Sequence, residues 1–258
     1  MAKIVSIHSY RGGTGKSNLT ANLAVCLASS GKRVAVVDTD IQSPGIHVIF
    51  DLGEDRVTHS LNDYLWGLCA IEETAHDVTP PEVAERGGTI FLIPSSIKTG
   101  EIARILREGY DVGMLNDGFQ ELTSALDLDY LMIDTHPGLN EETLLSVAIS
   151  DALVIILRPD RQDYQGTAVA VEVARNLEVP NLFLLVNKAA PSLDPASLRA
   201  KVETAYSAPV IGVFPQDELM LELASGGIYY LRYPDDAFSR EIAAVARTLM
   251  AAAEARPE

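Results

Sequence analysis

Short runs of Val, Ile and Leu alternate with helical patterns along the chain, and this alternation constrains the fold more than any other feature. Most of the runs lack polar alternation, which is typical of parallel strands that are buried on both faces. The expected strands cover residues 3–9, 33–38, 89–94, 130–134, 152–157, 181–186 and 210–214. The expected helices cover residues 16–29, 102–107, 115–126, 141–150, 166–177 and 195–206, and a closing helix has Phe238, Ile242, Val245 and Leu249 on one face. Strands that alternate with helices predict a doubly wound α/β fold, a mostly parallel sheet flanked by helices.

The chain shows no internal repeat and no break in composition, so a single domain over residues 1–258 is expected. The stretch 50–88 is its least regular part and contains the only tryptophan, Trp66. We interpret this stretch as a helical excursion between two core strands.

The composition of the chain indicates its cellular compartment and the kinds of partner that it can bind. Residues 1–5 run directly into a strand pattern, so no signal peptide is expected, and no apolar run reaches the ~18 residues of a membrane-spanning helix. Cys26 and Cys69 are too few for a disulfide scaffold, and Cys26 is expected in the core. A cytoplasmic protein is therefore expected. The formal net charge of −16 disfavours non-specific DNA binding, which depends on Lys and Arg at the phosphates.

A glycine-rich loop lies between the first expected strand and the first expected helix, and its Gly-Lys-Ser end indicates phosphate binding. The usual pattern has a glycine six positions before the lysine, but here Tyr10 and then Arg11 stand at the entrance of the loop. Lys16 would reach the β- and γ-phosphates, and the Ser17 hydroxyl would bind Mg²⁺. The phosphates would lie against the helix N-terminus and a cradle of backbone N–H groups. The cradle consists of Gly12, Gly13, Thr14, Gly15 and Lys16.

Carboxylates end two of the apolar runs. Asp38 and Asp40 end the second expected strand, and Asp134 ends the fourth. A carboxylate at the end of a buried strand is unfavourable unless it meets a cation or hydrogen-bond donors. Each of them alone is also explained as a helix N-cap or a turn residue. Together with Lys16 and a magnesium ion, the three carboxylates form a coherent site.

Three segments, "RGGTGKS", "DTDIQSPG" and "DTHPG", resemble the deviant Walker A, Walker A′ and Walker B/switch II motifs of the MinD/ParA ATPases. The resemblance covers nearly the whole chain. It implies an ATPase that forms a face-to-face homodimer around two ATP molecules, in which a signature lysine reaches the phosphates of the partner subunit. Arg11 stands in the position of that lysine, so the resemblance implies that Arg11 makes the contact across the dimer.

The resemblance also implies roles for residues outside the loop. Asp40 would orient the attacking water or couple it to the first switch. Asp38 and Asp134 would hold Mg²⁺ through waters, and Gly138 would bring the second switch to the γ-phosphate. Asn18 would meet the α-phosphate through its backbone. Three residues would surround the adenine: Asn187, Pro215 and Asp217.

His136 takes a position where proteins of the resembling family often have Pro or Ala. It could respond to charge beside the γ-phosphate, but an ordinary turn histidine is the favoured interpretation. Tyr229, Tyr230 and Tyr233 resemble the tyrosine clusters of bacterial tyrosine kinases, but they precede a patterned helix, which favours packing in the core or an interface.

The C-terminal segment indicates whether the protein would bind a membrane or DNA. The closing segment has no large aromatic or Lys-rich face, so no strong membrane anchor is expected. Arg232, Arg240 and Arg247 lie in a region where ParA proteins bind DNA. At this net charge a solvated helix face is the favoured interpretation.

The leading hypothesis is a slowly hydrolysing ATP switch that positions or partitions a cellular cargo, with a protein activator or cargo adaptor as its partner. Metal-cluster proteins that share the loop need cysteines near the second switch or a C-terminal Cys-x-x-Cys, and neither is present. An ATP-dependent metabolic ligase or kinase on the same fold, and a tyrosine-kinase-like protein, stay open as alternatives.

Overall fold

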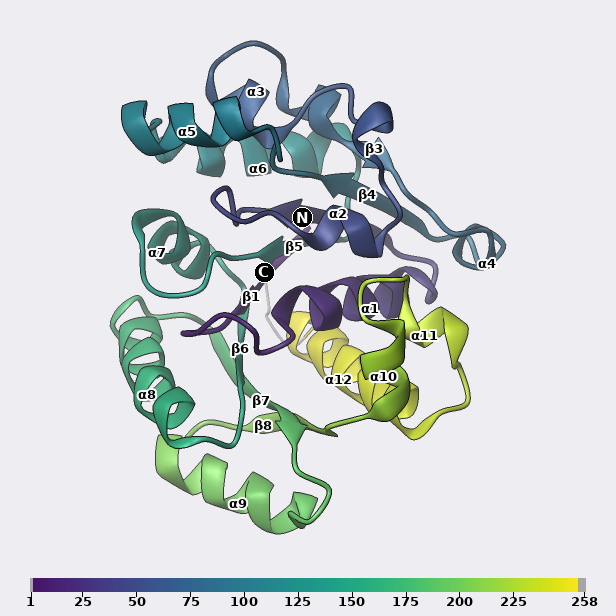
Figure 1. The fold of residues 1–258 in the computed structure, drawn as a ribbon, viewed down its shortest axis with the longest axis vertical. Coiled ribbons are helices and arrows are strands. Elements are labelled where there is room, and N and C mark those ends of the chain that lie inside the picture. The colour runs from purple at the N-terminus through teal and green to yellow at the C-terminus, as the bar shows by residue number, and fades with distance from the viewer. Residues whose placement is uncertain (1, 255–258) are drawn as a thin grey trace.

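The structure, a computed structural model, describes residues 2–254 and contains one eight-stranded sheet in the order β3-β4-β2-β5-β1-β6-β7-β8 (Figure 1). Neighbouring strands are parallel except β3, which runs antiparallel to β4. The strands are β1 (Lys3–His8), β2 (Arg33–Asp38), β3 (His76–Asp77), β4 (Thr89–Ile93), β5 (Tyr130–Asp134), β6 (Ala152–Leu157), β7 (Asn181–Ala189) and β8 (Val210–Pro215). The doubly wound, mostly parallel α/β fold expected from the sequence is confirmed.

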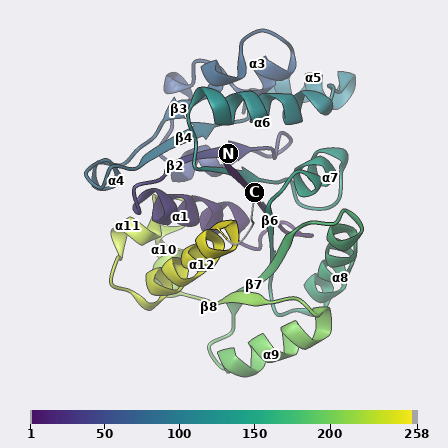
Figure 2. The same ribbon diagram turned by 180° about the vertical axis from the view of Figure 1, so that it is seen from behind.

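Helices cover both faces of the sheet (Figures 1 and 2). The α-helices are α1 (Lys16–Ala28), α2 (Ile46–Ile49), α3 (Leu61–Leu65), α4 (Pro81–Ala84), α5 (Thr99–Glu108), α6 (Gly113–Ala125), α7 (Glu141–Ala148), α8 (Arg161–Asn176), α9 (Pro195–Tyr206), α10 (Glu218–Leu223), α11 (Tyr229–Arg232) and α12 (Ala237–Glu254). Helices α1, α11 and α12 pack on one face, and α6, α7, α8 and α9 pack on the other. No helix within residues 2–254 is long and apolar enough to cross a membrane.

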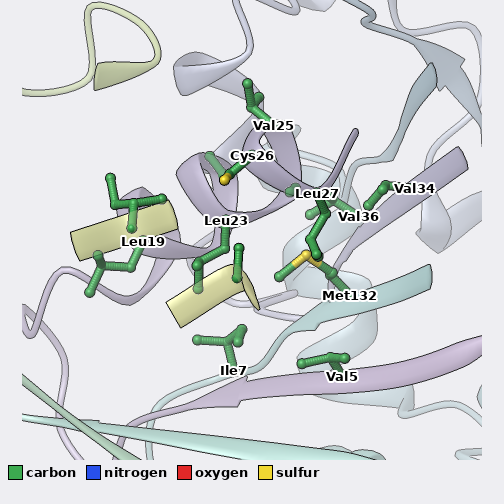
Figure 3. Packing of buried hydrophobic residues seen from close by; sticks show 14 of the residues in the cluster. Val5, Ile7, Leu19, Leu23, Val25, Cys26, Leu27, Val34, Val36 and Met132 are labelled. Atoms are coloured by element: carbon green, nitrogen blue, oxygen red, sulfur yellow. The ribbon is translucent and has the colours of Figure 1, made fainter. Parts of the chain in front are cut away.

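Successive residues of each central strand enter opposite cores, as expected for strands buried on both faces. Val34 and Val36 of β2 belong to the core under α1, whereas Ala35 and Val37 belong to the core under α6. Figure 3 shows α1 lying over the strands, with Leu23 and Leu27 pointing toward Ile7 and Met132. Leu19 and Cys26 of α1 and Val5, Val34 and Val36 of the strands belong to the same core. Cys26 is thus a core residue, as predicted. A fully buried Leu stabilises the fold by about 1.5–3 kcal/mol, so this face of α1 holds the beginning of the helix firmly against the sheet.

The structure differs from the sequence expectation at element ends. Helix α8 begins at Arg161 rather than at residue 166, because the Asp160 side chain accepts hydrogen bonds from the backbone N–H groups of Gln162 and Asp163. Helix α5 begins at Thr99 rather than at residue 102. Strand β7 continues to Ala189.

The stretch 50–88 contains four short helical pieces, as its interpretation as a helical excursion predicts. They are two 3-10 turns, η1 (Glu54–Arg56) and η2 (Ile71–Thr74), and helices α3 and α4. It also contains the edge strand β3, which was not expected.

Candidate functional site

The carboxyl ends of three adjacent strands, β2, β5 and β1, meet at one edge of the sheet. The strand register pairs Ile7 with Asp134 and Asp38 with Asp134, so the loops that follow these strands leave the sheet side by side. Open α/β sheets bind their ligands at this edge. The position of the three loops therefore defines the candidate site.

The glycine-rich loop runs from the end of β1 to the beginning of α1. Gly13 and Gly15 have φ angles of +78° and +89°, a left-handed conformation that favours glycine. A Cβ atom on Gly15 would also lie 2.5 Å from Nδ2 of Asn187, so a side chain there would strike β7. Two of the loop glycines are thus required by the backbone path itself.

Strand β7 holds this loop from the side. Asn187 Nδ2 donates to the carbonyl oxygen of Thr14 at 2.8 Å, and Lys188 Nζ donates to that of Gly13 at 2.8 Å. Asn187, to which the resemblance assigns adenine, therefore also supports the phosphate loop. Sequence reasoning did not identify Lys188, although the pair "NK" directly follows an apolar run.

Asp134 is the centre of a buried polar cluster at the beginning of α1. Its Oδ1 lies 2.7 Å from Lys16 Nζ and accepts the Thr20 hydroxyl at 2.9 Å, and its Oδ2 accepts the Ser17 hydroxyl at 2.6 Å. The Lys16 and Asp134 side chains are only 6% and 1% exposed. The structure thus brings together the loop lysine, the loop serine and the Walker B aspartate, which are 117 and 118 residues apart in sequence.

Asp38 lies buried beside this cluster. It accepts the backbone N–H groups of Asp40 at 3.0 Å and Gly45 at 3.1 Å. Burial, reinforced by the nearby charge of Asp134, raises the pKa of Asp38 to about 7. Two carboxylates and a serine hydroxyl in one buried place form an oxygen donor set that suits Mg²⁺.

This donor set fits a magnesium ion that takes further oxygens from water and a phosphate ligand. Within residues 2–254, no group of three or more His, Cys, Asp or Glu side chains forms a metal site made by the protein alone. The oxygen donors of Ser17, Asp38 and Asp134 fit Mg²⁺ bound together with a nucleotide.

Asp40 and His136 meet above the ends of β2 and β5. His136 Nδ1 lies 2.7 Å from Asp40 Oδ1, and the same oxygen accepts the backbone N–H of Ser43 at 3.1 Å. Sequence reasoning favoured an ordinary turn histidine at position 136 and missed this pair. Gly138, further along the same loop, has a φ of +91° and donates its N–H to the carbonyl oxygen of Ser9 at 3.2 Å.

His8 is a buried histidine at the end of β1 that sequence reasoning did not select. Its Nδ1 lies 2.8 Å from the Thr135 hydroxyl. Burial, followed by the charges of Lys16 and His136, lowers the pKa of His8 to about 3. His8 is therefore neutral at physiological pH, and the only signal in the sequence is a polar residue at the end of an apolar strand.

Two adjoining cavities lie over the loop and share Gly15 and Asn18. The first has a volume of about 390 Å³ and is lined by Ser9, the residues from Gly12 to Asn18, Asp40, Ser43, Gly45, Ile49, His136, Pro137 and Ser225. The second has a volume of about 300 Å³ and is lined by Leu19, Asn187, Lys188, Pro215, Gln216, Asp217, Met220, Leu221, Ala224 and Phe238 besides the shared pair. A cavity lined by the phosphate loop, adjoining one lined by the segment after β8, suits a phosphate chain joined to a base.

The residues assigned to the base have structural partners of their own. Asp217 caps α10 by accepting the Met220 N–H at 2.8 Å, and it also accepts the Tyr229 hydroxyl at 3.2 Å. Asn18 Nδ2 donates to the Ala224 carbonyl oxygen at 3.0 Å. The segment after β8 is thereby tied to α1.

Arg11 lies outside the buried cluster, with a side chain that is 42% exposed. Its guanidinium donates to the Gln162 side chain and lies 4.0 Å from Asp163 Oδ1, both at the beginning of α8. Arg158 holds Asp163 more closely, at 2.9 and 3.0 Å. Within one chain, Arg11 thus contacts α8 through an exposed hydrogen bond to Gln162.

Tyr229 lies in the core, and Tyr230 and Tyr233 are half-buried and pack against it, as the position of the cluster before a patterned helix predicts. Tyr229 is completely buried, with its ring centroid 4.9 Å from that of Tyr233 and 5.1 Å from that of Phe238. Arg232, Arg240 and Arg247 are exposed. Residues 255–258, which belong to the closing segment where no membrane-binding face is expected, lie outside the described residues.

The fold and the loop define the chain as a P-loop nucleotide-binding protein, and comparison with known proteins gives its family. A family model described as an AAA domain matches residues 2–180. An uncharacterized ATP-binding protein of Methanocaldococcus jannaschii is 30% identical over 254 residues, which cover 98% of this chain and 89% of that protein. The septum site-determining protein MinD of Helicobacter pylori is 26% identical over 238 residues, which cover 88% of this chain and 83% of that protein.

A solved structure of MinD complexed with Mg-ADP, from Pyrococcus horikoshii, has the same fold, with a TM-score of 0.82 at 20% identity over 98% of both chains. The chain belongs to the AAA domain family and, within it, to the MinD/ParA family of P-loop ATPases.

Proposed function

We propose that this protein is an ATP-driven molecular switch that binds MgATP, hydrolyses it slowly and alternates between a monomer and an ATP-sandwich homodimer. In this proposal the chain is a single ATPase domain in the cytoplasm, and its dimer positions or partitions a cellular cargo through a protein activator or adaptor. The observation that carries the proposal is that Lys16 and Ser17, at the beginning of α1, both donate to the buried carboxylate of Asp134.

The buried cluster has the groups that a triphosphate requires. Lys16 exchanges its contact with Asp134 for the β- and γ-phosphates, and the backbone N–H groups from Gly12 to Lys16 surround the phosphates. Ser17, Asp38 and Asp134 would hold the magnesium ion. When bound, the ion neutralises charge that develops on the phosphate oxygens.

Hydrolysis needs a water molecule aligned with the γ-phosphate, and Asp40 is the residue proposed to orient it. Asp40 lines the same cavity as Lys16, and its side chain is 13% exposed, so a water can reach it. Asn187, Pro215 and Asp217 are proposed to border the adenine in the second cavity.

Dimerisation is proposed to involve Arg11, because it stands at the entrance of the phosphate loop and its side chain is 42% exposed. A guanidinium matches phosphate oxygens with two parallel hydrogen bonds. Its hydrogen bond to Gln162 is exposed and easily exchanged for a stronger contact.

Sedimentation with and without MgATP, paired with an assay of phosphate release, tests the proposal. We expect slow phosphate release and a change from monomer to dimer on addition of MgATP. The variant Asp40→Ala is expected to hold ATP and accumulate as dimer while phosphate release is lost, and Asp55→Ala, an exposed aspartate away from the site, serves as its control. A monomer that consumes ATP only with a small-molecule acceptor would instead support a ligase or kinase.

A further inference from the structure

His136 and Asp40 join the loop after β2 to the loop after β5. The register pairs Asp38 with Asp134, and each residue of the new pair follows its strand end by the same two positions. The 2.7 Å separation of Nδ1 and Oδ1 is that of a charge-assisted hydrogen bond. Because an ionised carboxylate can only accept, the proton of this bond lies on His136 Nδ1.

The backbone that presents His136 is itself held in place. Its carbonyl oxygen accepts the Thr143 hydroxyl at 3.2 Å, and the N–H of Thr143 donates to the Asn140 side chain that caps α7 at 2.9 Å. Two residues beyond His136, the N–H of Gly138 donates to Ser9 beside the phosphate loop. The imidazole therefore reaches Asp40 from a fixed backbone, as a positioning group must.

The two oxygens of Asp40 differ in their partners. Both described hydrogen bonds, from His136 and from the Ser43 backbone, end on Oδ1. Within residues 2–254, Oδ2 has no hydrogen bond, and Asp40 lines the cavity over the loop. Oδ1 is thus held by two hydrogen bonds, and Oδ2 can accept a hydrogen bond from a water.

We propose that His136 is a positioning residue for ATP hydrolysis, which fixes the carboxylate of Asp40 through Oδ1 so that Oδ2 can orient the attacking water. This inference rests on the proposed ATPase function. A displacement of a reacting group by about 1 Å can cost about a hundredfold in rate.

Three substitutions of His136 separate positioning from other roles. His136→Asn places an amide N–H at nearly the same distance from Cβ as Nδ1 and keeps the donor, whereas His136→Gln moves the amide one bond further and His136→Leu removes it. We expect His136→Gln and His136→Leu to lower kcat by about tenfold or more with little change in KM. His136→Asn should recover most of kcat, although an amide cannot act as a base.

MgATP affinity, measured by calorimetry, shows that each variant is folded and keeps its site. His59→Asn is the matched control, because His59 lines neither cavity.

The outcomes separate this inference from the proposal on which it rests. Wild-type protein that releases no phosphate from ATP overturns the proposed function, and the inference with it. Active wild type together with unchanged kcat in His136→Gln and His136→Leu overturns the inference alone. Equal losses in His136→Asn and His136→Gln also overturn it, because they would mean that the imidazole acts by itself.

Discussion

Lys16 Nζ lies 2.7 Å from Asp134 Oδ1, in an ion pair whose side chains are only 6% and 1% exposed. A buried ion pair gains its attraction at the cost of desolvating both charges, and removing one partner leaves the other uncompensated. The pair therefore holds the loop lysine in place before any nucleotide binds. A triphosphate can replace Asp134 as its partner.

Replacing Lys16 should abolish nucleotide binding. Lys16→Ala removes the cation for the β- and γ-phosphates and leaves Asp134 with only hydroxyl donors, so we expect no MgATP binding and a lower melting temperature. Calorimetry and thermal unfolding measure the two effects. Lys32→Ala is the matched control, since its ion pair with Asp129 at 3.5 Å is exposed and worth about 0.2–1 kcal/mol. If Lys16→Ala bound MgATP with wild-type affinity, the assignment of the nucleotide site to this loop would be wrong.

Replacing Arg11 should separate nucleotide binding from dimerisation. Arg11→Ala is expected to keep the ATP affinity of the monomer, because the side chain points to α8 rather than into the buried cluster, but to lose ATP-dependent dimerisation and most hydrolysis. Arg11→Lys should keep part of both, since it retains the charge but not the two-pronged geometry. Light scattering with a non-hydrolysable ATP analogue measures the mass.

Gln162→Ala is the control for Arg11, because it removes the contact within the chain and leaves the arginine in place. We expect this variant to dimerise at least as well as wild type. A dimer of full mass in Arg11→Ala would show that the arginine makes no contact across the interface.

A methyl group at Gly15 should damage the loop. Gly15→Ala forces an L-residue to a φ of +89° and places its Cβ 2.5 Å from Asn187 Nδ2, the atom that holds the Thr14 carbonyl. We expect a loss of about 1–3 kcal/mol in unfolding free energy, together with weakened ATP binding. In the control Gly100→Ala, an open helical position in α5, stability should rise by about 0.5–1 kcal/mol. Unchanged unfolding and binding in Gly15→Ala would contradict the loop geometry.

Neither liposomes nor random-sequence DNA should bind tightly near physiological salt. The formal net charge of −16 opposes contact with phosphate-rich surfaces. Co-sedimentation with vesicles and filter retention of DNA, each with and without MgATP, measure the two interactions. Tight, salt-sensitive retention of DNA by the ATP form would refute this expectation and direct attention to Arg232, Arg240 and Arg247.

Much of the architecture could be predicted because it depends on local patterns. Strands buried on both faces need continuous apolar runs, and such runs are visible in the sequence. The glycine spacing predicts the phosphate loop because only glycine tolerates the angles found at Gly13 and Gly15. Element ends were less certain, because the beginning of α8 depends on one capping side chain, Asp160, rather than on a periodic pattern.

The sequence by itself determined the fold class, the loop that follows β1 and the residue types that end the central strands. Only the tertiary structure decided which of these residues meet. His136 finds Asp40 across 96 positions of sequence, Asn187 holds Thr14 across 173, and Arg11 contacts Gln162 across 151. Strand order and register determine such encounters, because they place distant loops side by side at one edge of the sheet. A local pattern records the chemistry of a side chain, but its partner is determined by the packing of the whole sheet.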